Sequence, residues 1–103
     1  MADKQLMHDT LAPIGITVLI EGEAKGADSL ARNWAIANKI KLLMFPAQWN
    51  KYGKAAGPIR NKQMLVEGKP ELVVAFLAPH SIGTRNMIAQ ARAANVRTIV
   101  IDL

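Results

Sequence analysis

The fold is decided by residues 16–28, ITVLIEGEAKGAD. The first five residues of this segment form a continuous apolar run rich in β-branched side chains, which is typical of a strand buried on both faces. Two glycines, Gly22 and Gly26, follow it and predict a tight turn with close backbone approach. Asp28 or Ser29 then begins a helix. The segment therefore predicts a strand, a turn and a helix, the unit from which parallel sheets are built.

The rest of the chain repeats this unit. Regular alternation of helical patterns with buried strands indicates a parallel sheet whose helices lie on both faces. We therefore predict an α/β fold: one domain, residues 1–103, with a Rossmann-like open parallel sheet of about four strands. Helices are expected at 3–12, 28–38, 58–67 and 85–94, further strands at 41–45, 71–76 and 97–101, and a long loop at 47–57.

Composition narrows the possible functions. The chain has 103 residues, a net charge of +5 and no cysteine, and it contains no apolar run near the roughly 20 residues of a membrane span. His8 and His80 lack the spacing of metal ligands, so we expect no metal and no cofactor. Residues 1–5 lead into a mixed segment rather than an apolar signal sequence. We expect a cytoplasmic protein without membrane contact, whose dispersed positive charge favours anionic partners.

An anion site is predicted at residues 56–61, AGPIRN. Gly57 allows close backbone approach, and Pro58 suits the first turn of a helix. The first N–H groups of a helix carry partial positive charge, and Arg60 adds a fixed fork of donors beside them. Asn61 adds an amide. Because such a helix start is a common phosphate site, this segment predicts phosphate binding.

Two further loops follow strands and are expected to meet this site. In parallel sheets, ligands bind beyond the carboxyl ends of the strands. The loop after the strand at 71–76 combines hydroxyls and backbone N–H groups, which suits a second phosphate or a ribose. Asp28 either caps its helix or accepts a hydroxyl, for instance from a ribose. The candidate ligand-binding residues are Gly22, Gly26, Asp28, Gly57, Arg60, Asn61, Ser81, Gly83 and Thr84.

Trp49 lies in the long segment 47–57. It could stack on a base beside the anion site, or it could be buried beneath the loop. Burial is the favoured prediction, because packing an indole ring stabilises an otherwise floppy segment.

Several of these residues together resemble the small YspA-like branch of the SLOG superfamily, over nearly the whole chain from Ile16. The resemblance rests on Gly22-x-x-x-Gly26-Ala27-Asp28, Trp49, Gly53-x-x-Ala56-Gly57-x-x-Arg60-Asn61-x-x-Met64, Ala75-Phe76, Ser81-x-Gly83-Thr84 and Met87. The superfamily unites Rossmann-like domains related to the Smf/DprA proteins and to the lonely-guy cytokinin-activating enzymes. The resemblance implies a nucleotide or nucleotide-derived ligand at the loops named above, and a phage or bacterial setting.

The chain departs from that family pattern in three ways. Family members usually begin with an additional strand, which would lie between the strands at 16–20 and 72–76. Those two strands must therefore pair directly, or a partner chain must close the gap, and we expect a homodimer or a higher oligomer. Glu23 replaces a usual glycine. Met87 stands where the lonely-guy hydrolases carry their catalytic glutamate.

Three functions remain open on the sequence. The favoured one is a module that binds a nucleotide-derived ligand, to sense or to sequester it, without turning it over. The alternative is a nucleotide N-glycosidase or phosphoribohydrolase, in which Arg60 stabilises phosphate charge and Asp28 or Glu23 is the acid/base group. The third is nucleic-acid binding, suggested by the net charge and by the Smf/DprA kinship, although no aromatic and basic stripe supports it.

Overall fold

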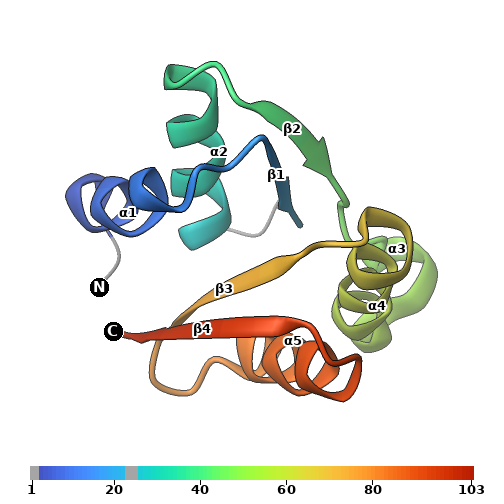
Figure 1. Ribbon diagram of the computed structural model, residues 1–103. Coiled ribbons are helices and arrows are strands. Elements are labelled where there is room, and N and C mark those ends of the chain that lie inside the picture. The colour runs from blue at the N-terminus through green and yellow to red at the C-terminus, as the bar shows by residue number, and fades with distance from the viewer. Residues whose placement is uncertain (1–2, 23–25) are drawn as a thin grey trace.

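The computed structural model describes residues 3–22 and 26–103 of the chain, in which helices and strands alternate (Figure 1). The helices are α1 (Lys4–Leu11), α2 (Ala27–Ala37), α3 (Trp49–Tyr52), α4 (Ala56–Gly68) and α5 (Ile82–Ala93). The strands are β1 (Val18–Glu21), β2 (Lys41–Met44), β3 (Leu72–Leu77) and β4 (Arg97–Asp102). Short 3₁₀ turns occupy Ala12–Ile14 and Gly53–Ala55. No helix in the described ranges is long and apolar enough to cross a membrane.

The first helix is confirmed, whereas the start of the second differs from the prediction. Asp3 caps α1 by accepting a hydrogen bond from the backbone N–H of Leu6 at 2.8 Å. The N-cap residue of α2 is Gly26, which has a φ of +84° and no side chain that could cap the helix. The prediction that Asp28 or Ser29 begins this helix is therefore wrong, since glycine takes the left-handed backbone turn that the chain needs there.

The segment 47–57 is mostly helical rather than a long loop. It contains α3 and a 3₁₀ turn, and Gly53, with a φ of +57°, separates the two. As a consequence α4 already begins at Ala56, and Gly57 lies inside its first turn. The start of α5 also differs from the predicted helix at 85–94, because the helix already begins at Ile82 with Ser81 as its N-cap residue.

The four strands form two separate parallel pairs. β1 pairs with β2 in the register Val18 with Lys41, and β3 pairs with β4 in the register Leu72 with Arg97. β1 and β3 do not pair with each other. The chain therefore has a Rossmann-like α/β architecture, but its strands form two two-stranded sheets instead of one sheet of four. Of the two alternatives given for the central gap, direct pairing of the strands at 16–20 and 72–76 is therefore wrong.

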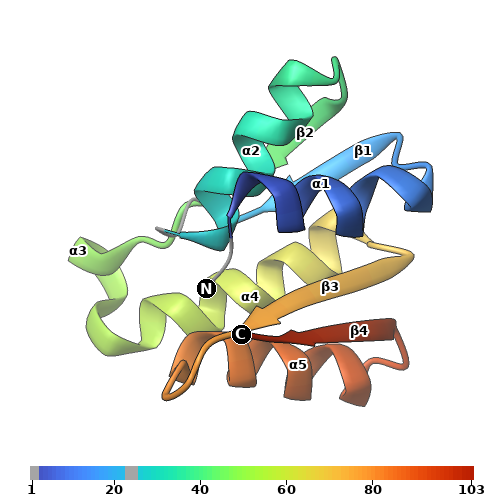
Figure 2. The ribbon, with the colours of Figure 1, turned by 90° about the vertical axis from the view of Figure 1, so that its left-hand side faces the viewer.

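Helices cover both faces of the strands. α1 contacts α2, α4 contacts α5, and the two helix pairs lie on opposite sides (Figure 1). Figure 2 shows that β1 and β3 run in the same direction and end at one edge, where α2, α4 and α5 begin. We call this edge the rim.

The buried core joins the two strand pairs at one end. Met7 and Leu11 of α1 pack with Leu19 and Ala35 from the first strand pair and its helix, and Phe76 of β3 belongs to the same cluster. α1 therefore spans both strand pairs, although the strands themselves remain apart.

Candidate functional site

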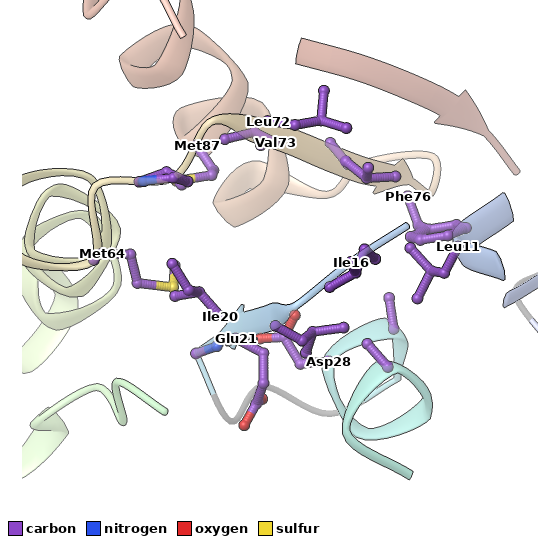
Figure 3. A pocket seen from close by; sticks show the side chains of 18 of the residues that line it. Leu11, Ile16, Ile20, Glu21, Asp28, Met64, Leu72, Val73, Phe76 and Met87 are labelled. Carbon is purple, nitrogen blue, oxygen red and sulfur yellow. Dashed lines mark hydrogen bonds between the residues drawn. The ribbon is translucent and has the colours of Figure 1, made fainter. Parts of the chain in front are cut away.

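A groove of about 750 Å³ separates β1 from β3. Residues 16–22 line one side of it and residues 72–76 line the other (Figure 3). Most of the candidate ligand residues line this same groove, namely Gly22, Asp28, Arg60, Asn61, Ser81, Gly83 and Thr84. Gly26 and Gly57 do not line it. The three segments that the sequence places at the strand ends therefore converge, with these two glycines as the exceptions.

Gly22, directly after β1, is enclosed by two charged side chains. Its N–H donates to Asp28 Oδ2 at 3.1 Å, and its carbonyl accepts a hydrogen bond from Arg60 Nη1. A Cβ atom at this position would overlap the guanidinium, with Arg60 Cζ only 2.7 Å away. A side chain at this position would therefore displace Arg60 from its bond to the carbonyl, so glycine permits the close approach of the two segments.

Arg60 is half-buried and held in place from two sides. Besides its bond to the carbonyl of Gly22, its Nε donates to Asn61 Oδ1 at 3.0 Å. These bonds use two of the five N–H donors of the guanidinium. Within residues 3–22 and 26–103 no acceptor is bonded to the other three, so the fixed cation can still bind an anion at the groove.

Asn61 has a structural role that the sequence does not reveal. Its side chain is only 3% exposed, and its Nδ2 donates to the Gly83 carbonyl and to Asn86 Oδ1, both at 3.2 Å. With its oxygen bonded to Arg60, both polar atoms of the amide have partners within the protein. Asn61 therefore positions Arg60 and fastens α4 to α5.

Asn86 and Gln90 complete this connection and were missed by sequence analysis. Gln90 Nε2 donates to Asn86 Oδ1 at 2.7 Å and to the Pro58 carbonyl at 3.1 Å. The two residues are four apart on α5, the spacing at which helical side chains meet. That spacing was the available signal, but nothing in it indicates that the pair faces α4.

The start of α5 forms the other wall of the rim. Ser81 Oγ donates to Thr84 Oγ1 at 2.8 Å, which fixes both hydroxyls within the first turn. The first N–H groups of a helix have no partner inside the helix and attract anions. Gly83 leaves open space where a side chain would stand. This turn therefore offers backbone and hydroxyl donors at the same end of the groove as Arg60.

The acidic residues near the groove, together with Met87, bear on whether an acid/base group is available for catalysis. Glu21 is 3% exposed and, like Asp28, lines the groove. Glu23, a candidate acid/base group, lies outside the described residues. Met87 and Met64 face the groove from α5 and α4 (Figure 3), so the position at which the lonely-guy hydrolases carry their glutamate is apolar here.

The prediction that Trp49 is buried beneath its loop is wrong. The side chain is 58% exposed, and the Cβ position of Gly57 lies 3.4 Å from its Cη2 atom. Because residues 49–55 form helical turns of their own, this segment does not depend on an indole ring for its packing. Gly57 faces this ring, which explains why it does not line the groove.

Comparisons with known proteins identify the family of the chain. The family model described as the YspA, cpYpsA-related SLOG family matches residues 4–52. The Gene 61 protein of Mycobacterium phage D29 is 32% identical over 108 residues, covering 94% of this chain and 85% of the phage protein. The chain belongs to the YspA- and cpYpsA-related SLOG family. This confirms the resemblance seen in the sequence, including a phage relative. No solved structure matches the chain.

Proposed function

We propose that this SLOG protein binds a nucleotide or nucleotide-derived ligand at the rim, to sense or to sequester it. One observation carries the proposal: the guanidinium of Arg60 is held by Gly22 and Asn61 at the groove end that the first turn of α5 also lines. Family membership supports the same class of ligand.

In this proposal, the phosphate of the ligand binds between Arg60 and the first turn of α5. The remaining guanidinium donors supply charge-assisted hydrogen bonds, and the free N–H groups of the first turn of α5 supply backbone donors. Because Arg60 and α5 are joined through Asn61, these donors are already oriented before a ligand arrives. Such preorganisation reduces the ordering cost of binding.

Asp28 is assigned to a ligand hydroxyl. It lines the groove next to Gly22, whose N–H its Oδ2 accepts, and a carboxylate oxygen is a suitable acceptor for a ribose hydroxyl. A carboxylate at this place repels phosphate, which is why the phosphate is assigned to Arg60 and not to the start of α2.

A nucleotide N-glycosidase is the second candidate. It is favoured by Glu21 and Asp28, which line the same groove as Arg60 and could act as acid/base groups. Met87 weighs against it, since a thioether cannot transfer a proton. Nucleic-acid binding and self-association into a homodimer or higher oligomer stay predictions, to be tested by salt-dependent DNA titration and by the mass in solution.

Thermal unfolding with AMP, ADP-ribose, NAD and cyclic nucleotides tests the binding proposal. A ligand at 100 times its dissociation constant stabilises the folded chain by about 2.7 kcal/mol, which raises Tm by about 10 °C for a chain of this size. Arg60→Gln should abolish the shift. Arg92→Gln, which makes the same charge change at an exposed position of α5, should retain it. Absence of a shift with every nucleotide would refute the proposal.

A further inference from the structure

Trp49 and Tyr52 expose two aromatic rings on α3. The side chain of Trp49 is 58% exposed and that of Tyr52 is 38% exposed, although tryptophan is highly buried on average in folded proteins. Neither ring belongs to the core cluster around Met7 and Phe76. The packing of the fold therefore gives no reason for two aromatic rings at this surface.

Gly57 holds the indole of Trp49 against the face of α4 that carries Arg60. The Cη2 atom of the indole lies 3.4 Å from the Cβ position of Gly57. Arg60 follows Gly57 by three residues, the spacing at which helical side chains share a face, with Cβ atoms about 5–6 Å apart. The edge of the indole ring is therefore within about 9 Å of the Cβ atom of Arg60. The ring and the fixed cation are neighbours on one helix face.

The surroundings of Trp49 suit an anionic ligand. Figure 2 shows α3 beyond the edge at which β1 and β3 end, so the exposed ring stands on the rim side of the molecule. Residues 49–62 contain no acidic side chain and four basic ones, Lys51, Lys54, Arg60 and Lys62. Basic groups gathered in one segment raise the local concentration of anions. An anion bound at Arg60 thus has an aromatic ring within reach.

We propose that Trp49 is the stacking surface for the base of the nucleotide whose phosphate Arg60 holds. This inference rests on the proposed function, and it accounts for the part of the ligand that the groove residues leave unassigned. Every nucleobase has a flat π-face, and stacking on an exposed aromatic side chain therefore tolerates any base. The ligand class is accordingly a nucleotide with an intact base, and not a phosphosugar.

Tyr52 is a poorer stacking surface than Trp49. Lys51 Nζ lies 5.1 Å from the centroid of the Tyr52 ring, so a cation–π contact already occupies one face of that ring. Within residues 3–22 and 26–103 no comparable cation or ring contact covers the indole of Trp49. The larger and more exposed of the two rings is therefore the one assigned to the base.

A matched pair of ligands isolates the contribution of the base. AMP and ribose 5-phosphate both carry a ribose and a 5′-phosphate, and only AMP carries a base. Calorimetric titration of the full chain measures the two affinities. We expect AMP to bind about tenfold or more tightly than ribose 5-phosphate, because stacking of one base on an aromatic side chain contributes at least about that factor.

A matched pair of variants assigns that contribution to Trp49. Trp49→Leu and Trp49→Phe both leave an apolar side chain over Gly57, but only phenylalanine retains an aromatic face. Trp49→Leu should weaken AMP binding by about tenfold and leave ribose 5-phosphate binding unchanged, whereas Trp49→Phe should retain most of the affinity for AMP. ADP-ribose, NAD and cyclic nucleotides are titrated in the same way. Melting temperatures without ligand verify that both variants fold.

The outcomes separate this inference from the proposed function. Binding of at least one nucleotide that Trp49→Leu leaves unchanged overturns the stacking role, while the phosphate site at Arg60 stands. Equal weakening of AMP and ribose 5-phosphate by Trp49→Leu also overturns it, because the indole would then support the site rather than contact the base. Binding of no nucleotide by the unsubstituted chain overturns the proposed function and this inference with it.

Discussion

The guanidinium of Arg60 donates a hydrogen bond to the carbonyl of Gly22, 38 positions earlier in the chain. The bond connects α4, which leads into the second strand pair, with the end of β1 in the first. Since β1 and β3 do not pair, this contact and the packing of Phe76 against α1 connect the two halves across the groove. The same side chain thus secures the rim and provides its fixed cation.

Substituting alanine for Gly22 should displace that cation. The new Cβ would overlap the guanidinium, so Arg60 must leave its position and lose its bond to the carbonyl. We expect a loss of about 1 kcal/mol in unfolding free energy, the usual contribution of one hydrogen bond, and at least a tenfold loss of nucleotide affinity. Thermal unfolding and ligand titration measure both.

Gly83→Ala is the matched control for that substitution. Its Cβ would meet no atom within 4 Å, and alanine favours a helix interior over glycine by up to about 1 kcal/mol. Its stability should therefore be unchanged or slightly raised. If Gly22→Ala bound nucleotides as well as the unsubstituted chain does, the assignment of Arg60 to phosphate would be wrong.

Replacing Asn61 by alanine should lower the unfolding free energy by more than the loss of a small side chain alone would. The substitution removes three hydrogen bonds at a buried position, so we expect a loss of about 2–3 kcal/mol in unfolding free energy. Asn33→Ala, at an exposed position of α2, should change stability by less than about 0.5 kcal/mol. Equal melting temperatures for the two variants would show that Asn61 does not fasten α4 to α5.

Local patterns account for what the sequence could predict. The strand at 72–77 is recognisable from its own apolar run, and the convergence of Arg60 with Ser81 follows from the rule that strand ends in parallel sheets share an edge. The helix at 49–52 could not be predicted in this way, because four residues carry too little periodicity to distinguish a helical turn from a loop.

Long-range contacts account for what the sequence could not predict. Asn61 and Asn86 are 25 positions apart, and nothing in either segment indicates that their amides meet. The separation of β1 from β3 is likewise a property of the whole chain. Each strand has the composition of a buried central strand, yet composition does not specify the neighbour with which a strand pairs.

The exposure of Trp49 can be tested against the second tryptophan of the chain. Trp34 packs on the core cluster and donates its indole N–H to His8 Nδ1 at 3.0 Å, whereas Trp49 is 58% exposed. Trp49→Ala should therefore cost less than about 1 kcal/mol, and Trp34→Ala about 3 kcal/mol or more.

Fluorescence quenching by iodide provides an independent measurement of the same difference. The Trp34→Ala variant, which retains only Trp49, should be quenched strongly, and the Trp49→Ala variant only weakly. Strong protection of Trp49 from iodide would contradict the exposed position over Gly57.

Asp28→Asn separates binding from catalysis. An asparagine keeps the size of the side chain and can still accept the N–H of Gly22, but it loses the negative charge and cannot act as a general acid or base. For a binding module we expect no release of free base from AMP by the unsubstituted chain. Its affinity for ribonucleotides should fall by about tenfold or more in the variant, because a hydrogen bond to a charged group contributes about 1.5–3 kcal/mol. Chromatography of the free base and a ligand titration give the two measurements. Base release by the unsubstituted chain that disappears in Asp28→Asn, while binding is retained, would replace the binding module with the N-glycosidase and make Asp28 its acid/base group.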